Sequence, residues 1–217
     1  MKLVLASNNA VKLGELQALL AGLPLRLVAQ GELAIAEADE PHATFIENAL
    51  LKARHAARAS GCAALADDSG LCVASLGGAP GVISAHFAGA LPAVEGEDRE
   101  AQRRRQDAAN NRALLAQLAA KAAQGPGGRR GHFISTLVAL RHADDPEPLV
   151  AVGRWPGEIL TAPRGQQGFG YDPLVFIPDL QSSVAELSDA QKNRHSHRAR
   201  SAALLRSMLI DVWHLAP

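Results

Sequence analysis

The chain has 217 residues, of which 47% are apolar and 20% charged, so it can bury a substantial core as one domain or as two small lobes. Its 22 basic and 22 acidic side chains cancel, which argues against a protein that wraps nucleic acid with a strongly basic face. No run approaches the ~18 apolar residues of a membrane span, and no signal-peptide pattern is visible. We therefore expect a cytoplasmic protein in which Cys62 and Cys72 are reduced thiols.

The first predicted elements are a strand over residues 2–6, a polar turn and a helix. Ser7, Asn8 and Asn9 are good N-cap residues, and the leucines that follow recur on one helical face. Lys12 then lies in the first turn, where the helix dipole disfavours a positive charge. A bound anion at the helix N-terminus would explain this placement. The alternative, a simple cap followed by a surface lysine, stays open.

A strand is predicted over residues 25–29, and a second helix from Thr44 to Gly61. Thr44 and Glu47 form a capping box at the start of this helix. One side of the helix is rich in alanine, which permits close packing, and the polar side carries Lys52. A lysine is a compact point charge suited to phosphate.

The next strand, over residues 62–66, is expected to deliver Asp67 and Asp68 to its carboxyl end, the usual position of active residues in open α/β sheets. Adjacent carboxylates repel each other and usually need a cation, and hard oxygen ligands suit magnesium. A plain turn closed by Gly70 is the alternative. Further acidic side chains that could bind the metal precede the second helix: Glu37, Asp39 and Glu40.

The rest of the chain predicts more helices and strands and one glycine-rich loop. The ranges are a helix over 110–123, a flexible turn over 125–128, an antiparallel strand pair over 133–140 and 149–154, a strand over 174–177, and a last helix from Ser188 to about Trp213. In the loop, Phe169 and Tyr171 precede Asp172, a pattern that can stack on a base and bond its edge, or simply pack as a small core. Helices alternating with strands, followed by antiparallel strands, predict an α/β fold with a mixed sheet and two lobes around a cleft.

Six segments carry a resemblance in their order along the chain. They are Leu5–Asn9 with Lys12 and Glu15, Thr44–Ala49 with Lys52 and Ala53, Ala66–Leu71, Leu76–Gly81, Gly168–Pro173, and Ala185–Leu187 through Lys192 to Ser196–Arg198. Together they resemble the non-canonical purine nucleoside triphosphate pyrophosphatases, the inosine triphosphatase family, and its bacterial members above all. The departures are Ser7-Asn8, where many bacterial members have Thr-Gly, and the glycine-rich turn over 125–131.

The resemblance implies one pyrophosphatase domain over residues 1–217, built on an elongated mixed α/β sheet with two lobes around a nucleotide cleft. It also implies a homodimer and a magnesium-dependent cleavage of ITP, dITP or XTP between the α and β phosphates. By resemblance, the phosphates are held by Ser7, Asn8, Asn9, Ala10, Val11, Lys12 and Lys52, magnesium by Glu40 and Asp68, and the nucleoside side by Ser69, Phe169, Gly170, Tyr171, Asp172, Lys192, His197 and Arg198. Asp68 is the candidate base, although either Asp67 or Asp68 could activate the water.

Two other functions compete with this one. A Maf-like nucleotide pyrophosphatase has a related fold but usually carries Ser-Pro-Arg-Arg after the first strand, where this chain has Asn8-Asn9-Ala10-Val11. A non-catalytic nucleotide sensor or nucleic-acid-binding module would use Arg103–Arg105 and Arg129–Arg130. Neutral net charge and the paired acids count against such a module.

Overall fold

The computed structural model describes residues 1–121 and 128–216, and the chain divides into two compact units. Unit 1 contains Met1–Ser69, Ser135–Arg154 and Asn193–Pro217, and unit 2 contains Gly70–Ile134 and Trp155–Lys192. The expected flexible turn over 125–128 lies almost wholly outside the described residues.

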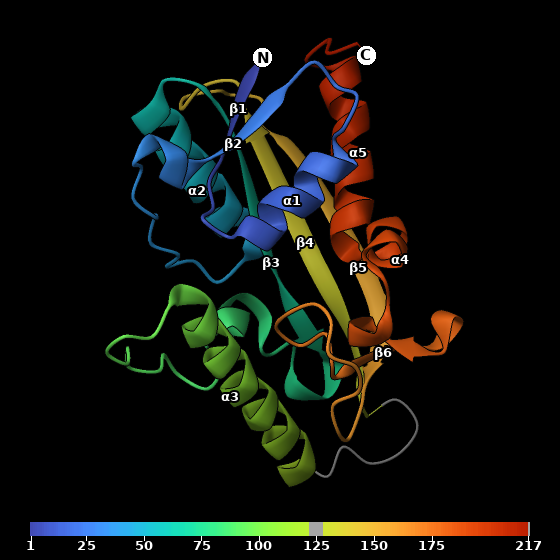
Figure 1. Ribbon diagram of the computed structural model, residues 1–217. Helices are drawn as coiled ribbons and strands as arrows, with labels where there is room; N and C mark the ends of the chain where they lie inside the picture. Colours follow the sequence, from blue (N-terminus) through green and yellow to red (C-terminus); the bar gives the residue numbers. More distant parts are fainter. Residues whose placement is uncertain (122–127, 217) are drawn as a thin grey trace. The chain divides into compact units, whose positions relative to one another are not determined.

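Helices and strands alternate in the first part of the chain, and consecutive strands and then the last helices follow (Figure 1). Their bounds are β1 Lys2–Leu5, α1 Ala10–Leu19, β2 Arg26–Ala29, α2 Phe45–Ser60, β3 Ala63–Val73, α3 Arg99–Ala120, β4 Arg130–Leu140, β5 Leu149–Ile159, β6 Val175–Ile177, β7 Ser182–Ser183, α4 Asp189–His195 and α5 His197–Asp211. Short 3-10 segments lie at Gln30–Leu33, Ala74–Leu76, Gly81–His86, Pro178–Leu180 and Val184–Glu186.

The described strands form one mixed sheet in the order β2-β1-β3-β4-β5-β6-β7. β1 pairs in parallel with β2 and β3, and β6 pairs antiparallel with β5 and β7. Parallel pairing of β1 and β3 carries both strands in the same direction, so Ser7 and Asp67 follow the paired residues Leu5 and Leu65 at the same edge of the ladder. The mixed α/β sheet expected from the sequence is confirmed.

Strand side chains in unit 1 alternate between two apolar clusters, as the period-2 geometry of a strand demands. Leu3 and Leu5 pack with leucines of α1 and α5, whereas Val4 and Ala6 pack with the alanines of α2. Helices α1 and α5 therefore cover one face of the sheet in unit 1, and α2 covers the other (Figure 1).

The second helix is capped as the sequence predicts. The Thr44 hydroxyl accepts the Glu47 N–H at 3.3 Å, and Gly61 ends α2 in the left-handed conformation, with φ 64°. Four alanines of this helix are buried against the sheet: Ala49, Ala53, Ala56 and Ala57. Because these four side chains are methyl groups, α2 can lie close to the strands that it covers.

Several predicted boundaries are wrong. Strand β4 begins at Arg130 instead of residue 133, and β5 continues past residue 154 to Ile159. Strand β3 continues through Asp67 and Asp68 to Val73, because Arg198 pairs with the Asp67 carboxylate and Lys52 with one oxygen of Asp68. Helix α3 begins at Arg99, where Asp98 accepts the Ala101 N–H at 2.7 Å as an N-cap. The expected last helix is two helices, because Ser196 caps α5 through the Ala199 N–H at 3.1 Å.

Unit 2 has its own apolar core. Its members include Leu71, Leu114, Leu118, Phe133, Trp155, Ile159, Tyr171, Leu174 and Val175. Cys62 and Cys72 form no disulfide in the described part of the chain, as the sequence predicts. Among the described residues, none of the helices combines the length and the apolar character that a bilayer span demands.

The turn between β4 and β5 is held by one buried carboxylate, Asp145. It accepts the Arg141 N–H at 2.9 Å and the Glu147 N–H at 3.0 Å, and it pairs with the Arg141 guanidinium at 3.3 Å. Burial alone would raise the pKa of Asp145, but these backbone hydrogen bonds and the Arg141 charge outweigh it and lower the pKa. A lowered pKa in the folded state means that ionised Asp145 stabilises the fold above its unfolded pKa, and that this contribution is lost as the pH falls through the folded pKa.

Asp145→Asn should therefore lower the free energy of unfolding by about 1–2 kcal/mol at pH 7, and the difference from wild type should shrink as the pH falls from 5 to 3. Urea denaturation at several pH values measures this difference. The neighbouring Asp144, whose side chain is 88% exposed, is the matched control, and Asp144→Asn should change the free energy by less than ~0.5 kcal/mol throughout. A pH-independent difference for Asp145→Asn would contradict the assignment.

Candidate active site

The N-terminus of α1 is organised by the polar turn before it. Asn9 caps the helix, and its Oδ1 accepts the Val11 N–H at 3.0 Å and the Lys12 N–H at 3.2 Å. Ser7 Oγ accepts the Asn9 N–H at 3.1 Å, which fixes the turn itself. No acidic residue occupies the first turn of α1, so nothing on this helix opposes an anion at its positive end.

Lys12 and Lys52 converge on one backbone atom. The Lys12 ammonium lies 3.4 Å from the carbonyl oxygen of Asp67, and the Lys52 ammonium lies 3.3 Å from the same oxygen. One lysine comes from α1 and the other from α2, helices on opposite faces of the sheet in unit 1. The structure therefore brings together the two lysines that the sequence singles out and the acid pair in β3.

The Asp67 carboxylate is fully engaged inside unit 1, where it is only 1% exposed. Its Oδ1 accepts the Ser135 hydroxyl at 2.9 Å. Its Oδ2 accepts Nε of Arg198 at 2.9 Å and the Ser69 hydroxyl at 3.3 Å, and it pairs with the Lys12 ammonium at 3.2 Å. These contacts come from α1, β3, β4 and α5, so one carboxylate joins four elements.

Arg198 is the main partner of Asp67 and is itself 1% exposed. Besides Asp67, its guanidinium contacts Glu15 of α1 through Nη1 and donates to Ser69 Oγ at 3.2 Å through Nη2. Burial alone would lower the pKa of Arg198, but Asp67 and Glu15 outweigh it and raise the pKa. The guanidinium stays charged and ties α5 to α1 and β3.

The two adjacent acids have opposite pKa shifts. Burial would raise the pKa of Asp67, but the charges of Arg198 and Lys12 outweigh it and hold that pKa far below its usual range. Burial raises the pKa of Asp68 to about 6 in spite of the opposing charge of Lys52, and the Glu40 carboxylate adds to the rise. Asp67 is therefore permanently ionised near neutral pH, whereas Asp68 can exchange a proton.

Asp68 and Glu40 face one cation, the Lys52 ammonium. Lys52 Nζ lies 2.8 Å from Asp68 Oδ1 and 3.0 Å from Glu40 Oε2. The second oxygen of Asp68, Oδ2, is buried and has no hydrogen-bond partner among the residues that the structure describes. Burial would lower the pKa of Lys52, but the two carboxylates outweigh it and raise the pKa.

This pair of carboxylates fits a magnesium ion on its donor chemistry. Mg²⁺ in nucleotide enzymes is held by one or two carboxylates, with waters and substrate phosphates as the other ligands. Asp68 Oδ2 is an orphaned buried oxygen, and the partly exposed Glu40 is its acidic neighbour. Within residues 1–121 and 128–216, no group of three or more histidine, cysteine or acidic side chains is placed to enclose an ion.

His197 and Arg198 open helix α5, which approaches β5 very closely at Gly153. A Cβ atom on Gly153 would lie 2.1 Å from the His197 carbonyl oxygen and 2.5 Å from the Ser201 nitrogen. The Ser201 hydroxyl in turn contacts Ser135 Oγ at 2.9 Å, next to Asp67. His197 is 6% exposed, so its side chain is buried at the start of α5.

The predicted nucleoside-side residues Phe169, Gly170, Tyr171, Asp172 and Lys192 belong to unit 2. Lys192 Nζ lies 2.8 Å from Asp172 Oδ2 and 4.7 Å from the centre of the Phe169 ring. Asp172 Oδ2 also accepts the Phe169 N–H at 3.0 Å. These residues form one cluster within unit 2, and its role beside His197 and Arg198 of unit 1 stays a prediction.

Sequence reasoning gave no role to several residues that shape the site: Glu15, Ser135, Gly153 and Ser201. Ser135 interrupts an apolar strand and Glu15 follows Lys12 by three positions on the same helical face, so both left a signal in the sequence. Gly153 and Ser201 left none, because their effect depends on how closely β5 and α5 pack.

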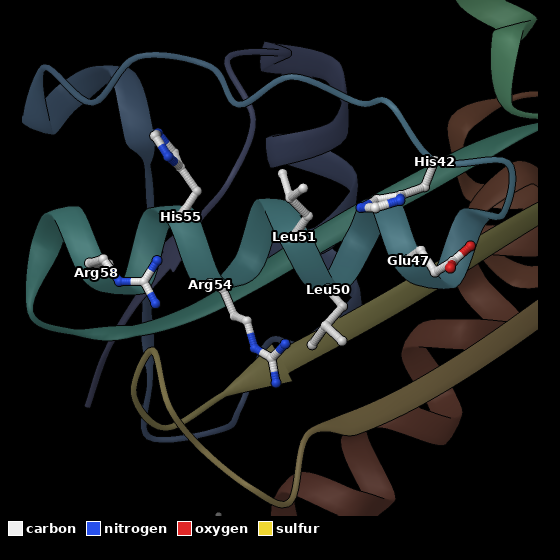
Figure 2. A pocket seen from close by; sticks show the side chains of 7 residues that line it. All are labelled: His42, Glu47, Leu50, Leu51, Arg54, His55 and Arg58. Atoms are coloured by element: carbon white, nitrogen blue, oxygen red, sulfur yellow. The ribbon is translucent and has the colours of Figure 1, made fainter.

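A surface hollow of about 400 Å³ lies elsewhere in unit 1, along α2 (Figure 2). It is lined by His42, Glu47, Leu50, Leu51, Arg54, His55 and Arg58. Figure 2 shows Leu50 and Arg54 on one side of the helix and Leu51 and His55 on the other, so the polar groups do not converge. None of the residues around Asp67 lines this hollow, and it is not the candidate site.

The chain is similar to known proteins over nearly its whole length. Residues 3–208 match the Ham1 family. The chain is 63% identical to the dITP/XTP pyrophosphatase of Methylibium petroleiphilum over 98% of this chain and 99% of that protein. It is 62% identical to the dITP/XTP pyrophosphatase of Leptothrix cholodnii over the full length of both chains. The solved structure of a HAM1 protein from Coxiella burnetii superposes with a TM-score of 0.83 at 39% identity, covering 96% of this chain and 98% of that one.

Gly153→Ala should destabilise the protein by about 1–3 kcal/mol or more and lower its activity, because the added methyl group displaces the start of α5. Thermal unfolding and turnover measure the two effects. Gly14→Ala is the matched control: Gly14 lies in the middle of α1 with nothing within 4 Å of the added Cβ, so the change should be neutral or stabilising by up to ~1 kcal/mol. Equal stability of the two variants would show that the close approach of α5 to β5 is unimportant.

Proposed function

Because the chain belongs to the Ham1 family, we propose that it is a nucleoside triphosphate pyrophosphatase that cleaves dITP, XTP and ITP between the α and β phosphates. The products are the nucleoside monophosphate and pyrophosphate. The observation that carries the proposal is the convergence of Lys12, Lys52 and Asp68 around the Asp67 carbonyl oxygen. Two ammonium groups and an ionisable acid at one point suit a polyphosphate chain and its attacking water.

The triphosphate is assigned to the N-terminus of α1 and to the two lysines. Residues Ser7, Asn8, Asn9, Ala10 and Val11 form the turn and first helical residues, whose N–H groups and helix dipole favour an anion. Lys12 and Lys52 add two positive charges that neutralise the charge developing on the leaving pyrophosphate.

Magnesium is assigned to Glu40 and Asp68. The orphaned Asp68 Oδ2 and the two carboxylates around Lys52 support this assignment. When bound, the ion would supply charge neutralisation for the phosphate oxygens. Lys52 already contacts both carboxylates, so it keeps the two side chains near each other and limits their mutual repulsion.

Asp68, and not Asp67, is assigned as the base that takes a proton from the attacking water. A pKa of about 6 leaves Asp68 largely ionised at neutral pH while bringing its basicity closer to that of an effective proton acceptor. Asp67 is engaged by Arg198, Lys12, Ser135 and Ser69, and its low pKa makes it a poor base. Ser69 is assigned to contact the substrate.

The nucleoside is assigned to Phe169, Gly170, Tyr171, Asp172, Lys192, His197 and Arg198. Phe169 can stack on a base, while buried donors can pair with the oxygen at position 6 of hypoxanthine or xanthine and oppose the amino group of adenine. We also propose that both units serve one domain over residues 1–217, that the protein is a homodimer, and that it acts in the cytoplasm.

The Maf-like alternative loses its support. The matched family is Ham1, and relatives that are more than 60% identical over nearly the whole chain are dITP/XTP pyrophosphatases.

A substrate panel with pyrophosphate detection tests the function. Purified protein with magnesium should release pyrophosphate and monophosphate from dITP and XTP, and it should cleave dATP at least about 10²-fold less efficiently. Chelation with EDTA should abolish turnover, and added magnesium should restore it. Comparable kcat/KM values for dATP and dITP would refute the proposed base recognition, and release of orthophosphate in place of pyrophosphate would refute the bond assignment.

Asp68→Asn should lower kcat by about 10²–10⁴-fold, because the amide cannot accept the proton. Its melting temperature should stay within a few degrees of wild type, since Lys52 keeps Glu40 as a partner and a desolvated charge is removed. Asp39→Asn, a change to an exposed acid near Glu40, is the control and should leave kcat within about twofold. Near wild-type turnover of the Asp68 variant would exclude it as the base.

A further inference from the structure

The glycine-rich loop of unit 2 is tied to helix α3 at a single residue, Gly170. The Asp107 carboxylate accepts the Gly170 N–H at 2.8 Å, and the Asn111 side-chain amide donates to the Gly170 carbonyl at 3.0 Å. Both backbone polar groups of one loop residue are therefore satisfied by side chains of α3. Asp107 and Asn111 are four positions apart, so they project from the same face of that helix.

The loop that Asp107 and Asn111 hold contains two glycines whose backbone conformations other residues rarely adopt. Gly170 has φ 61°, in the left-handed region, and Gly168 has φ 77°. A Cβ on Gly168 would lie 2.1 Å from Asp172 Oδ2, the atom that accepts the Phe169 N–H and the Lys192 ammonium. Two glycines give the backbone of this loop many accessible conformations. Hydrogen bonds from residues outside the loop are therefore needed to fix one of them.

Holding Gly170 also fixes its neighbours on both sides. Phe169 lies before it, with the ring 4.7 Å from Lys192 Nζ, and Tyr171 lies after it, with its hydroxyl donating to the Ser84 carbonyl at 2.9 Å. Tyr171 is buried, whereas Phe169 is half-buried. The rigid part of the loop is thus anchored in the core of unit 2, and the Phe169 ring is the part still accessible to a ligand.

We propose that Asp107 and Asn111 are positioning residues that hold the 168–172 loop in the conformation that receives the nucleoside. They act through Gly170 and touch no substrate themselves. The inference rests on the proposed function, because it takes the Phe169 loop to be the nucleoside side of the site. Loss of either side chain should then weaken nucleotide binding without changing the chemistry at the triphosphate.

Two isosteric substitutions separate this role from a general effect on the fold. Asn111→Asp keeps the size of the side chain but replaces the donor with a carboxylate facing the Gly170 carbonyl, so KM for dITP should rise about tenfold with kcat within about twofold. Asp107→Asn can still present an oxygen to the Gly170 N–H, so its KM should stay within about twofold, whereas Asp107→Ala should raise KM about tenfold.

Two further measurements make the test specific. Gln106→Ala is the matched control on the same helix. In the described hydrogen bonds, the Gln106 side chain contacts Gly89 and Leu91 and no residue of the 168–172 loop. Its loss should lower thermal stability and leave KM within about twofold. Inorganic tripolyphosphate probes the phosphate subsite without a base, and its inhibition constant should be the same, within about twofold, in wild type, Asn111→Asp and Asp107→Ala.

The outcomes are distinct from a failure of the proposed function. Wild-type protein that releases no pyrophosphate from dITP would refute the function before any variant is compared. With an active wild type, an unchanged KM in Asn111→Asp would overturn the inference. A tripolyphosphate inhibition constant that rises in parallel with KM would overturn it as well, since the effect would then not be confined to the nucleoside side.

Discussion

The buried charge of Asp67 is the constraint on which the rest of unit 1 depends. A carboxylate with 1% exposure is tolerated only when its partners replace the lost water, and here they come from α1, β3, β4 and α5. Removing one partner of such a buried pair typically costs about 3–5 kcal/mol, because the other charge is left uncompensated. The elements that carry the candidate site are thus fixed relative to one another, within this unit, by electrostatics as well as by apolar packing.

The same interactions give two neighbouring aspartates different chemistry. Asp67 is surrounded by donors and cations, and the charges of Arg198 and Lys12 hold its pKa far below the usual range despite its burial. Asp68 is only one residue away, but alternation along β3 sends its side chain to the α2 side of the sheet, where burial and Glu40 act against the single ammonium of Lys52. Groups of one type whose pKa values are driven apart often divide acid–base roles between them, and this difference is why we propose Asp68, and not Asp67, as the base.

Much of the fold and of the site was predictable from short-range patterns. The N-caps at Asn9 and Thr44 and the alanine face of α2 are local signals, and the structure confirms them. Strand–turn–helix order indicated an anion near Lys12, and the resemblance to the inosine triphosphatase family implied that Lys52 and Asp68 act with it. The extension of β3 through the acid pair was not predictable, because polar residues in a strand look like its end until their partners are known. The break at Ser196 and the approach of α5 to Gly153 are equally non-local, since they depend on which strand packs beneath the helix.

The shared acceptor of Lys12 and Lys52 is a peptide carbonyl and not a side chain. Every amino acid supplies that oxygen, so no exchange at position 67 deletes it. A substitution at position 67 would therefore remove the carboxylate and its ion pairs with Lys12 and Arg198, but the main-chain oxygen between the two ammonium groups would remain. The spacing of Lys12 and Lys52 thus has a backbone component that mutagenesis of side chains cannot delete.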